Sequence, residues 1–325
     1  MLFRSGLFAV DTAEFTSENA YMTAVSDENG YFEFNNIPYG EYAVKEIAAP
    51  AGYIFSDEKY HVVINEDGDV IEITAENKPI TVEISKRDIY GNELVGAEMV
   101  LENADGETVD KWTSDDTNHV VSKLGAGEYV LKEIAAPDGY VIATDIKFSI
   151  DVYGNVTVEN VDSTAVSDNG YPLITMVDDT TKVQISKQDI TTGEELPGAT
   201  LQIIDENGNV VEEWVSTNEP HMIEGKLIAG KEYTLKEIIA PEGYEITNEI
   251  KFTVNADGTV TEVVMYDEHT PDLETPPTVT IDTPNTGVSA DNSAELYLVA
   301  TAVIMVFGMV ICKRNGKEQR KDDVK

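Results

Sequence analysis

The chain has 325 residues, and its 22 Lys and Arg residues stand against 61 Asp and Glu residues, which gives a formal net charge of −39. A chain this acidic repels a nucleic-acid backbone, and we therefore exclude nucleic acid as a partner. We expect the charged side chains to lie on a solvated surface. The one cysteine, Cys312, cannot form an intrachain disulfide, and the four scattered histidines lack metal-ligand spacing, so we predict no metal site and no cofactor.

Three copies of one short motif divide the chain. They read YAVKEIAAPAGY at residues 42–53, YVLKEIAAPDGY at 129–140 and YTLKEIIAPEGY at 233–244, so successive copies start 87 and 104 residues apart (129 − 42, 233 − 129). Repeats at this spacing indicate modules in series, each large enough to hold a small core. We place the modules at residues 1–78, 79–180 and 181–268.

The segments between these copies have the alternation and the turn residues of β-structure. Asn-Gly and Asp-Gly turns between short alternating runs predict hairpins at residues 27–34, 66–73, 205–214 and 256–264. No strong helical periodicity precedes residue 290. We therefore predict an all-β body of tandem, Ig-like sandwich modules.

Each copy of the motif places a glutamate on an apolar strand face. Side chains alternate between the two faces of a strand, so Leu131 and Glu133 point the same way. Glu46 and Glu237 have the same parity in their own copies. Because a buried carboxylate is costly unless it is paired or neutral, these glutamates predict a polar partner inside each module.

Two further polar positions fall on inward faces. By the same alternation, Lys86 in VEISKRD and Lys187 in VQISKQD face inward on early strands. The last strand of each module ends in an inward acid or amide: Asn77, Asp178 and Asp267. Nine residues separate Asn77 from Lys86 and Asp178 from Lys187 (86 − 77, 187 − 178), which supports this register. Asn160 has suitable parity too and is the alternative partner of Lys86.

A buried lysine beside a glutamate and an Asp or Asn forms a reactive set. Burial disfavours charge and so favours a free amine and a neutral acid. The amine can attack the Asp or Asn carbonyl carbon while the glutamate polarises that carbonyl and moves protons. We predict two isopeptide bonds. One joins Lys86 to Asp178 with Glu133 as the catalyst, and the other joins Lys187 to Asp267 with Glu237 as the catalyst. A buried ion pair without a bond is the alternative.

The first module lacks the lysine of the other two. The lysine precedes the glutamate by 47 and 50 residues in the complete modules (133 − 86, 237 − 187), and the same count back from Glu46 passes the start of the sequence. Glu46 and Asn77 are therefore predicted to face a core without an amine, beside an unpaired strand edge. We expect this module to be the least stable, and the sequence to be the C-terminal portion of a longer protein.

Two tryptophan–histidine pairs share a spacing of seven residues: Trp112 with His119, and Trp214 with His221 (119 − 112, 221 − 214). We expect each pair to pack on a hairpin, and we assign it no chemistry.

The C-terminal region combines a linker, an apolar segment and a basic tail. Residues 269–282 are rich in Pro and Thr and predict an extended linker. Residues 296–312, LYLVATAVIMVFGMVIC, form an uncharged segment at the short end of what spans a bilayer as a helix. The basic residues that follow place the C-terminus in the cytoplasm and the modules outside the cell. Before the segment lies the pentapeptide TPNTG: Thr283, Pro284, Asn285, Thr286 and Gly287.

The pentapeptide, the apolar segment and the tail, residues 283–325, together resemble the cell-wall sorting signal of Gram-positive surface proteins. The resemblance implies that sortase cuts between Thr286 and Gly287 and joins the Thr286 carboxyl to cell-wall peptidoglycan. Thr283 stands where that signal usually has leucine, which leaves the sortase class open. The implied location is extracellular, covalently bound to the wall, with membrane insertion only before sorting.

The motif copies, together with LVGAEMVLENADG and LPGATLQIIDENG, resemble the Cna B-type (SpaA-like, prealbumin-like) repeats of Gram-positive adhesins and pilins. The resemblance covers nearly all of residues 1–268. It implies a prealbumin-like fold, and it implies the same lysine-to-Asp/Asn bonds with the motif glutamate as catalyst.

These features predict a wall-anchored surface stalk or adhesin segment that holds an unknown host or surface ligand away from the cell. A minor or basal pilin subunit is the alternative. Leu173 follows Tyr171 and Pro172 where shaft pilins usually have lysine, which argues against a shaft subunit. The sequence shows no nucleophile–base set apart from the single-turnover triads, so we predict no enzyme activity in the ordinary sense.

Overall fold

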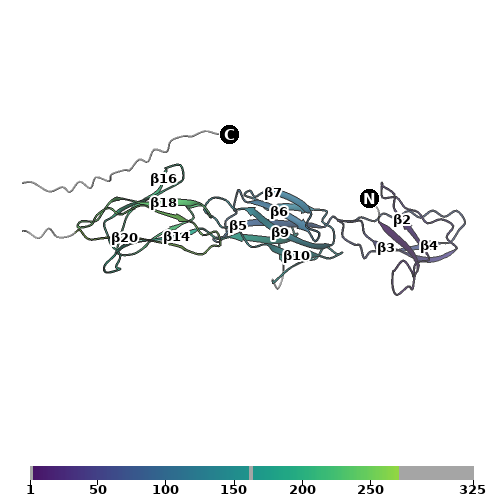
Figure 1. Cartoon of the computed structure of the whole chain (residues 1–325). Coiled ribbons are helices and arrows are strands. Elements are labelled where there is room, and N and C mark those ends of the chain that lie inside the picture. The colour runs from purple at the N-terminus through teal and green to yellow at the C-terminus, as the bar shows by residue number, and fades with distance from the viewer. Residues whose placement is uncertain (1–2, 161–163, 271–325) are drawn as a thin grey trace, which may run out of the picture. The chain divides into compact units, whose positions relative to one another are not determined.

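The computed structural model describes residues 3–160 and 164–270, and this part of the chain is all-β (Figure 1). Within these residues no helix is long and apolar enough to cross a membrane. The predicted linker beyond residue 270, the pentapeptide at Thr283–Gly287 and the apolar segment at 296–312 lie outside the described residues. The prediction of an all-β body is confirmed for the described part.

The middle module is a sandwich of two sheets around one core. One sheet has the order β11-β10-β9-β6-β7, and the other has the order β12-β13-β5-β8. The buried core draws on both, with Met99 and Leu131 from the first sheet and Ile84 and Met176 from the second. The strands are β5 (Thr81–Asp88), β6 (Glu98–Asn103), β7 (Thr108–Thr113), β8 (His119–Ser122), β9 (Gly127–Ala135), β10 (Ile146–Ile150), β11 (Val156–Val158), β12 (Ala165–Val166) and β13 (Pro172–Asp178).

The third module repeats this plan with fewer strands. Its sheets have the orders β16-β15-β18-β19 and β17-β14-β20. Leu201, Leu235, Ile185 and Met265 meet in its core. The strands are β14 (Lys182–Asp189), β15 (Thr200–Ile204), β16 (Val210–Val215), β17 (His221–Glu224), β18 (Glu232–Ile239), β19 (Ile250–Thr253) and β20 (Thr261–Asp267).

In both of these modules the lysine-bearing strand pairs with the last strand in parallel. β5 pairs with β13 so that Lys86 lies opposite Met176, and β14 pairs with β20 so that Lys187 lies opposite Met265. The first and last strands of a module thus lie side by side. A link between them would close almost the whole module into a loop.

The first module has one sheet, of order β2-β1-β3-β4. Its strands are β1 (Arg4–Ala9), β2 (Met22–Val25), β3 (Gly40–Ala48) and β4 (Lys59–Ile64). The predicted final strand, with Ile71 and Ile73 facing inward, is not formed, and Ile71 is 45% exposed. The physical reason is that the described residues hold no lysine-bearing strand to pair with this segment, as β5 pairs with β13.

The hairpin predictions are partly wrong. Residues 205–214 do join paired strands, β15 and β16. At 256–264 the turn forms, but its flanking strands β19 and β20 belong to different sheets. At 27–34 and 66–73 the turns form, but the residues directly after each turn, 31–34 and 70–73, are not in a strand.

Candidate functional site

Each motif glutamate lies next to a β-bulge on an inner strand of its sheet. In the middle module Glu133 pairs with Met99, but the neighbouring Glu98 pairs with Ala135, so Ile134 is an extra residue on β9. The same shift follows the glutamate in the other modules, where Glu46 pairs with Ser5 and Glu237 with Leu201. A bulge bends the strand and re-aims the adjacent side chain. It recurs wherever the motif recurs.

One oxygen of each glutamate is held by a backbone N–H ten residues further along. The N–H of Ala143 donates to Glu133 Oε2 at 2.7 Å, and that of Thr247 donates to Glu237 Oε2 at 2.9 Å. In the first module the N–H of Ser56 donates to Glu46 Oε2 at 2.8 Å. The other oxygen is thereby left to face the core. The alternation of the sequence indicates which face the glutamate takes, but it does not reveal this anchor or the bulge.

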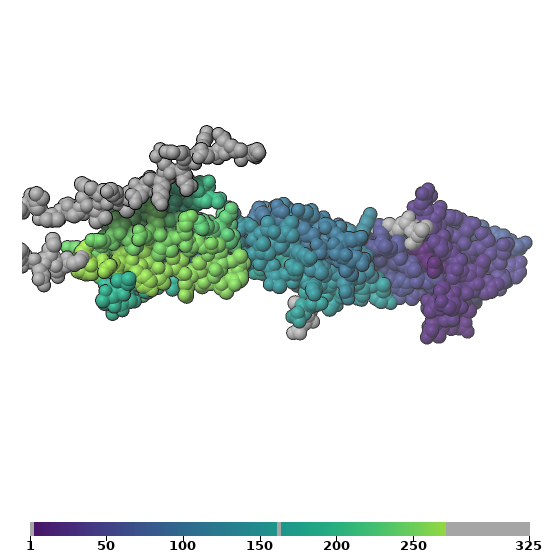
Figure 2. Space-filling model, in the orientation of Figure 1, coloured from purple at the N-terminus to yellow at the C-terminus, as the bar shows by residue number. Residues whose placement is uncertain are grey.

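The structure brings each predicted lysine, glutamate and aspartate together. Lys86 Nζ lies 3.4 Å from Glu133 Oε1 and is in contact with Asp178 Oδ1. Lys187 Nζ lies 3.1 Å from Glu237 Oε1 and is in contact with Asp267 Oδ1. Both lysines are at most 3% exposed, and both aspartates are 0% exposed. Figure 2 shows one face of the middle and third modules, inside which these four side chains are buried.

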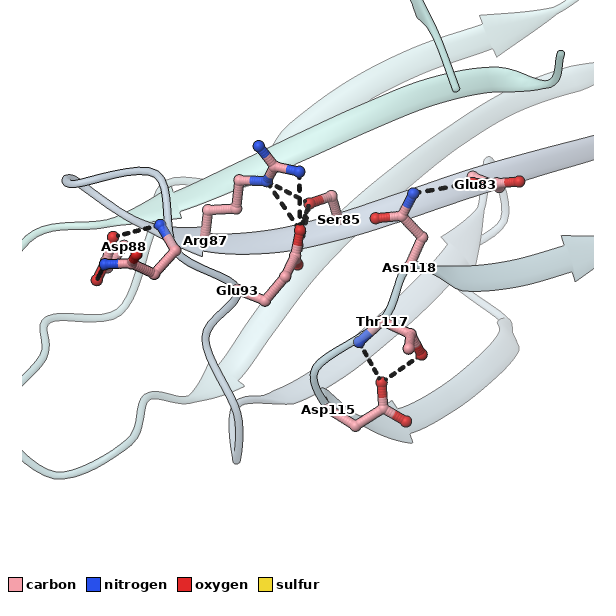
Figure 3. A network of polar contacts seen from close by, with 9 residues as sticks. Glu83, Ser85, Arg87, Asp88, Glu93, Asp115, Thr117 and Asn118 are labelled. Atoms are coloured by element: carbon pink, nitrogen blue, oxygen red, sulfur yellow. Dashed lines mark hydrogen bonds and ion pairs between the residues drawn. The ribbon is translucent and has the colours of Figure 1, made fainter. Parts of the chain in front are cut away.

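The opposite face of β5 is fastened by polar contacts, which keeps Lys86 turned inward (Figure 3). Arg87 Nε donates to Glu93 Oε1 at 3.0 Å, and the Ser85 hydroxyl donates to the same carboxylate. Further along the strand, Asn118 Nδ2 donates to Glu83 Oε2 at 2.9 Å. A slip of one residue would break these bonds and turn Lys86 out of the core.

Burial sets the electrostatics of the glutamates. It raises the pKa of Glu133 to about 7, against the opposing effects of the Ala143 N–H and of the Lys86 charge. Burial likewise raises the pKa of Glu237. A carboxyl group that titrates near neutrality can give and take a proton at physiological pH.

The aspartates have few other partners. Besides the lysine and the glutamate, no described residue forms a hydrogen bond with the side chain of Asp178 or Asp267. An ionised carboxylate held for structure alone would normally be met by several donors. The arrangement instead places a buried amine against an aspartate oxygen, with a glutamate oxygen 3.4 Å away in the middle module and 3.1 Å away in the third.

The alternative partner, Asn160, is not at this site. It is exposed and has a left-handed backbone conformation, with φ of 60°, just beyond the end of β11. The structure therefore brings Asp178, and not Asn160, to Lys86.

The first module contains the glutamate and the amide without a lysine. Asn77 Nδ2 donates to Glu46 Oε1 at 3.0 Å and to Glu46 Oε2 at 3.1 Å. It also donates to the carbonyl oxygen of Ile54 at 3.3 Å. Glu46 is buried and Asn77 is half-buried. Among the described residues, no lysine or arginine forms an ion pair with Glu46.

The tryptophan–histidine pairs do stack, but not on a hairpin. The rings of Trp112 and His119 lie 4.0 Å apart at 9°, and those of Trp214 and His221 lie 4.4 Å apart at 15°. In the middle module the two rings come from β7 and β8, which are edge strands of different sheets. Each stack therefore joins the two sheets of its module.

Comparison with known proteins gives one family and several solved structures. The family model described as "SpaA: Prealbumin-like fold domain" matches residues 7–79, 80–164 and 181–269. One of the matching solved structures is the TIE protein of Bacillus anthracis. The match has 25% identity and a TM-score of 0.40, and it covers 82% of this chain and 48% of that chain. The match thus spans about half of the TIE chain.

Two pilus proteins of Lactobacillus rhamnosus GG also match. The shaft pilin spaA matches at 13% identity and a TM-score of 0.27, over 59% of this chain and 98% of that chain. A C-terminal fragment of the pilus adhesin SpaC matches at 18% identity and a TM-score of 0.36, over 60% of this chain and 98% of that chain. No curated protein matches. With three matched segments that together make up more than half of its length, the chain belongs to the family of SpaA prealbumin-like fold domains.

Proposed function

We propose that the chain is part of a bacterial surface stalk whose second and third modules are each locked by an internal lysine–aspartate amide bond. The observation that supports this most directly is the contact of a buried lysine amine with a buried aspartate in both modules, beside a glutamate whose pKa burial raises. Family membership is consistent with a pilin or stalk role.

The bond would form by condensation. The neutral Lys86 amine attacks Cγ of the protonated Asp178 carboxyl group, a C–N bond forms, and the C–OH bond breaks. Glu133 takes a proton from the attacking nitrogen and returns it to the departing hydroxyl, which leaves as water. Lys187, Glu237 and Asp267 would react in the same way.

The mechanical benefit follows from where the bond lies. It joins strands that pair in parallel at the two ends of a module, and it closes a loop of 92 residues in the second module and 80 in the third (178 − 86, 267 − 187). If the chain-entropy estimate for disulfides applies, each bond stabilises its module by about 4–5 kcal/mol. A chain without disulfides would gain resistance to pulling and to proteolysis.

Intact-mass measurement of the folded chain tests the proposal. We expect a mass two waters below that of the sequence. Glu237→Gln should restore one water, and Asp178→Asn should replace one lost water by a lost ammonia, because the leaving group changes from hydroxyl to amide nitrogen. An unshifted mass in a folded sample contradicts the bonds and leaves the buried ion pair.

Attachment to the cell wall is the second part of the proposal, and it is supported by the sequence alone. The order of TPNTG at 283–287, the apolar segment at 296–312 and the basic tail favours sorting by sortase. Fragments released from the wall should end at Thr286 and carry a wall peptide. Recovery of the protein from membranes with Cys312 still attached would show a permanent anchor.

The same extracts separate a stalk from a pilin subunit. A single wall-bound species fits the stalk, whereas a ladder of covalent multimers would identify a minor or basal pilin.

A further inference from the structure

The second half of the motif, Ala-Pro-x-Gly-Tyr, takes no part in the lysine sites, yet it folds the same way in all three copies. In each copy the N–H of the tyrosine donates to the carbonyl oxygen of the proline at 3.1 Å. The glycine, third in this turn, has φ between 84° and 88°, the left-handed value that a type II turn requires there. The turns are residues 50–53, 137–140 and 241–244. A turn that recurs with the motif indicates a role of its own.

Each turn holds the segment by which the chain leaves its module. The tyrosine forms an antiparallel bridge with that exit segment: Tyr53 with Pro79, Tyr140 with Thr180, and Tyr244 with His269. The carbonyl oxygen of the glycine accepts a hydrogen bond, of 2.8 to 2.9 Å, from the residue after the bridge: Gly52 from Ile80, Gly139 from Thr181, and Gly243 from Thr270. The exit from every module is therefore fastened in the same way.

The connector between the second and third modules, residues 179–181, is held from both sides. On the side of the second module, the N–H of Val141 donates to the Asp179 carbonyl oxygen at 2.9 Å. On the side of the third, the N–H of Gly225 donates to the Thr181 carbonyl oxygen at 3.0 Å. Both threonines of the connector are at most 4% exposed. A flexible linker would leave these groups to water, so this connector has the properties of a structured element.

The glycine of the turn also touches the backbone of the module that follows. A Cβ on Gly139 would lie 2.2 Å from the Gly225 carbonyl oxygen, and a Cβ on Gly52 would lie 2.4 Å from that of Lys123. Lys123 and Gly225 have the same place in their modules, directly after β8 and β17, and both have left-handed φ, of 65° and 67°. Since a Cβ cannot come this close to backbone atoms, glycine alone fits the turn while these contacts last.

The third copy of the turn has no such contact within the described residues. The three atoms nearest to a Cβ on Gly243 all belong to the His269 ring, at 3.3 Å and beyond. The turn and its hold on the exit segment thus form without a following backbone against the glycine. The close contacts at Gly52 and Gly139 therefore belong to the junctions between modules, and not to the turn itself.

We propose that the Ala-Pro-x-Gly-Tyr turn is a fixed joint, which clamps the exit segment of its own module and seats the next module against its glycine. For its purpose the joint rests on the proposed stalk function. The amide bonds would close residues 86–178 and 187–267, and the connector lies outside both loops. The bonds can therefore lock each module but cannot stop one module from swinging on the next. A stalk that holds its end away from the cell needs this second device.

A distance between two spin labels tests the joint in the full chain. The labels are placed on Asp116→Cys and Asn218→Cys, exposed positions 102 residues apart (218 − 116) in the second and third modules, with Cys312→Ser. We expect one narrow distance distribution. A Gly-Ser insertion after Thr180 leaves every residue of both modules in place, and it should broaden the distribution severalfold. A chain without the insertion that is as broad as the chain with it would overturn the proposal.

Gly139→Ala tests the residue on which the joint depends. It should broaden the distribution as the insertion does, because the added methyl group must displace the Gly225 carbonyl. Gly208→Ala is the matched control: Gly208 has φ of 83° and nothing within 4 Å of its Cβ position, so the variant has the same backbone strain away from the joint. Gly243→Ala is a second control, in the turn without a neighbour. Both controls should remain narrow, and a Gly139→Ala distribution no broader than that of Gly208→Ala would overturn the assignment.

Trypsin gives a readout that separates the joint from the amide bonds. Lys182 is the single Lys or Arg between Asp178 and Lys187, so a cut after it releases the third module from the second, whereas a cut inside a bonded loop leaves its pieces joined. Gly139→Ala should speed this release at least about tenfold over Gly208→Ala, which corresponds to about 1.4 kcal/mol of lost joint stability. Equal rates would overturn the joint.

The masses of the released fragments report on the proposed function independently. Fragments that are each short of one water show that the bonds formed, so a rate difference between the two glycine variants then belongs to the joint. Fragments of unshifted mass would contradict the amide bonds, while a faster release from Gly139→Ala would still support the joint.

Discussion

The middle module and the first module carry the same motif, the same bulge and the same anchored glutamate, yet they differ in what surrounds it. The middle module packs two sheets around a core that includes Met99, Leu101, Leu131 and Met176. In the first module the buried cluster is Leu7, Val44 and Val62. Each buried side chain of this size contributes about 1.5–3 kcal/mol, so the motif alone does not make a stable module. Within the described residues, one strand and the lysine on it separate the two cases.

The largest expected effect of this difference is on local stability. Backbone amides of the first module should exchange with solvent about a thousandfold faster than those of the second and third modules, because a bond worth about 4 kcal/mol corresponds to about three factors of ten. Hydrogen exchange followed by mass spectrometry measures this, and limited proteolysis should cut residues 1–78 first. Equal protection in all three modules would break the comparison.

The next effect comes from making a complete module resemble the first one. Glu237→Gln should prevent the bond in the third module and lower its free energy of unfolding by about 4–5 kcal/mol, while the second module keeps its own bond. Thermal unfolding of the full chain should then show the third module melting early. Glu245→Gln, at an exposed position on the loop after the same strand, is the matched control and should change neither mass nor stability. A third module that keeps its stability without its bond would show that the bond is not what stabilises it.

The sequence shows where the modules differ, and the reason lies in local periodicity. Alternation placed Glu133 and Lys86 inward, and the nine-residue spacing selected Asp178, all of which the structure brings together. The absent lysine of the first module was also visible by counting. These are properties of single strands and of spacing, and a sequence displays them directly.

The errors concern pairing between distant segments. The alternating residues at 71–77 predicted a strand, but a strand forms only where it has a pairing partner, and in the described residues that partner is missing. The run at 256–264 looked like a hairpin, but β20 pairs with β14, about 80 residues earlier in the chain. Asn160 satisfied the parity rule, but it falls in a turn after β11. Parity gives the face of a residue in a strand, and it does not establish that a strand is present.

A pH effect sharpens the comparison inside the middle module. The folded module binds the Glu133 proton more tightly than the unfolded chain does, because burial raises its pKa from an ordinary value of 4.5 to about 7. Lys86→Met cannot form the bond, and it also removes the Lys86 charge, which lowers the Glu133 pKa. The neutral carboxyl group should therefore stabilise the module fully below pH 4.5, and this stabilisation should be lost as the pH rises through a folded pKa above about 7. The loss should be on the order of 3 kcal/mol.

Thermal unfolding of Lys86→Met between pH 4.5 and pH 8 measures this dependence. The double variant Lys86→Met/Glu133→Gln is the control, and it should show a flatter profile over this range, with Asp178 as the remaining acid of the site. A stability that rises with pH in Lys86→Met would contradict the assignment, because it would mean that the ionised form of Glu133 is the one the fold favours.

The smallest expected effect is on the contact that joins the two sheets. The Trp112–His119 and Trp214–His221 stacks occur in the two complete modules, and the 87-residue repeat puts Val25 and Phe32 at the equivalent positions of the first module, which has no second sheet to join. A double-mutant cycle on Trp112→Ala and His119→Ala should give a coupling energy of about 0.5–1.5 kcal/mol, the usual worth of a stacked aromatic pair beyond its buried area. The cycle on Trp214 and His221 should give a similar or smaller value, since those rings lie slightly farther apart. The cycle on Val25 and Phe32 should give a coupling near zero, and a coupling there as large as in the middle module would mean that the first module does close into a sandwich in solution.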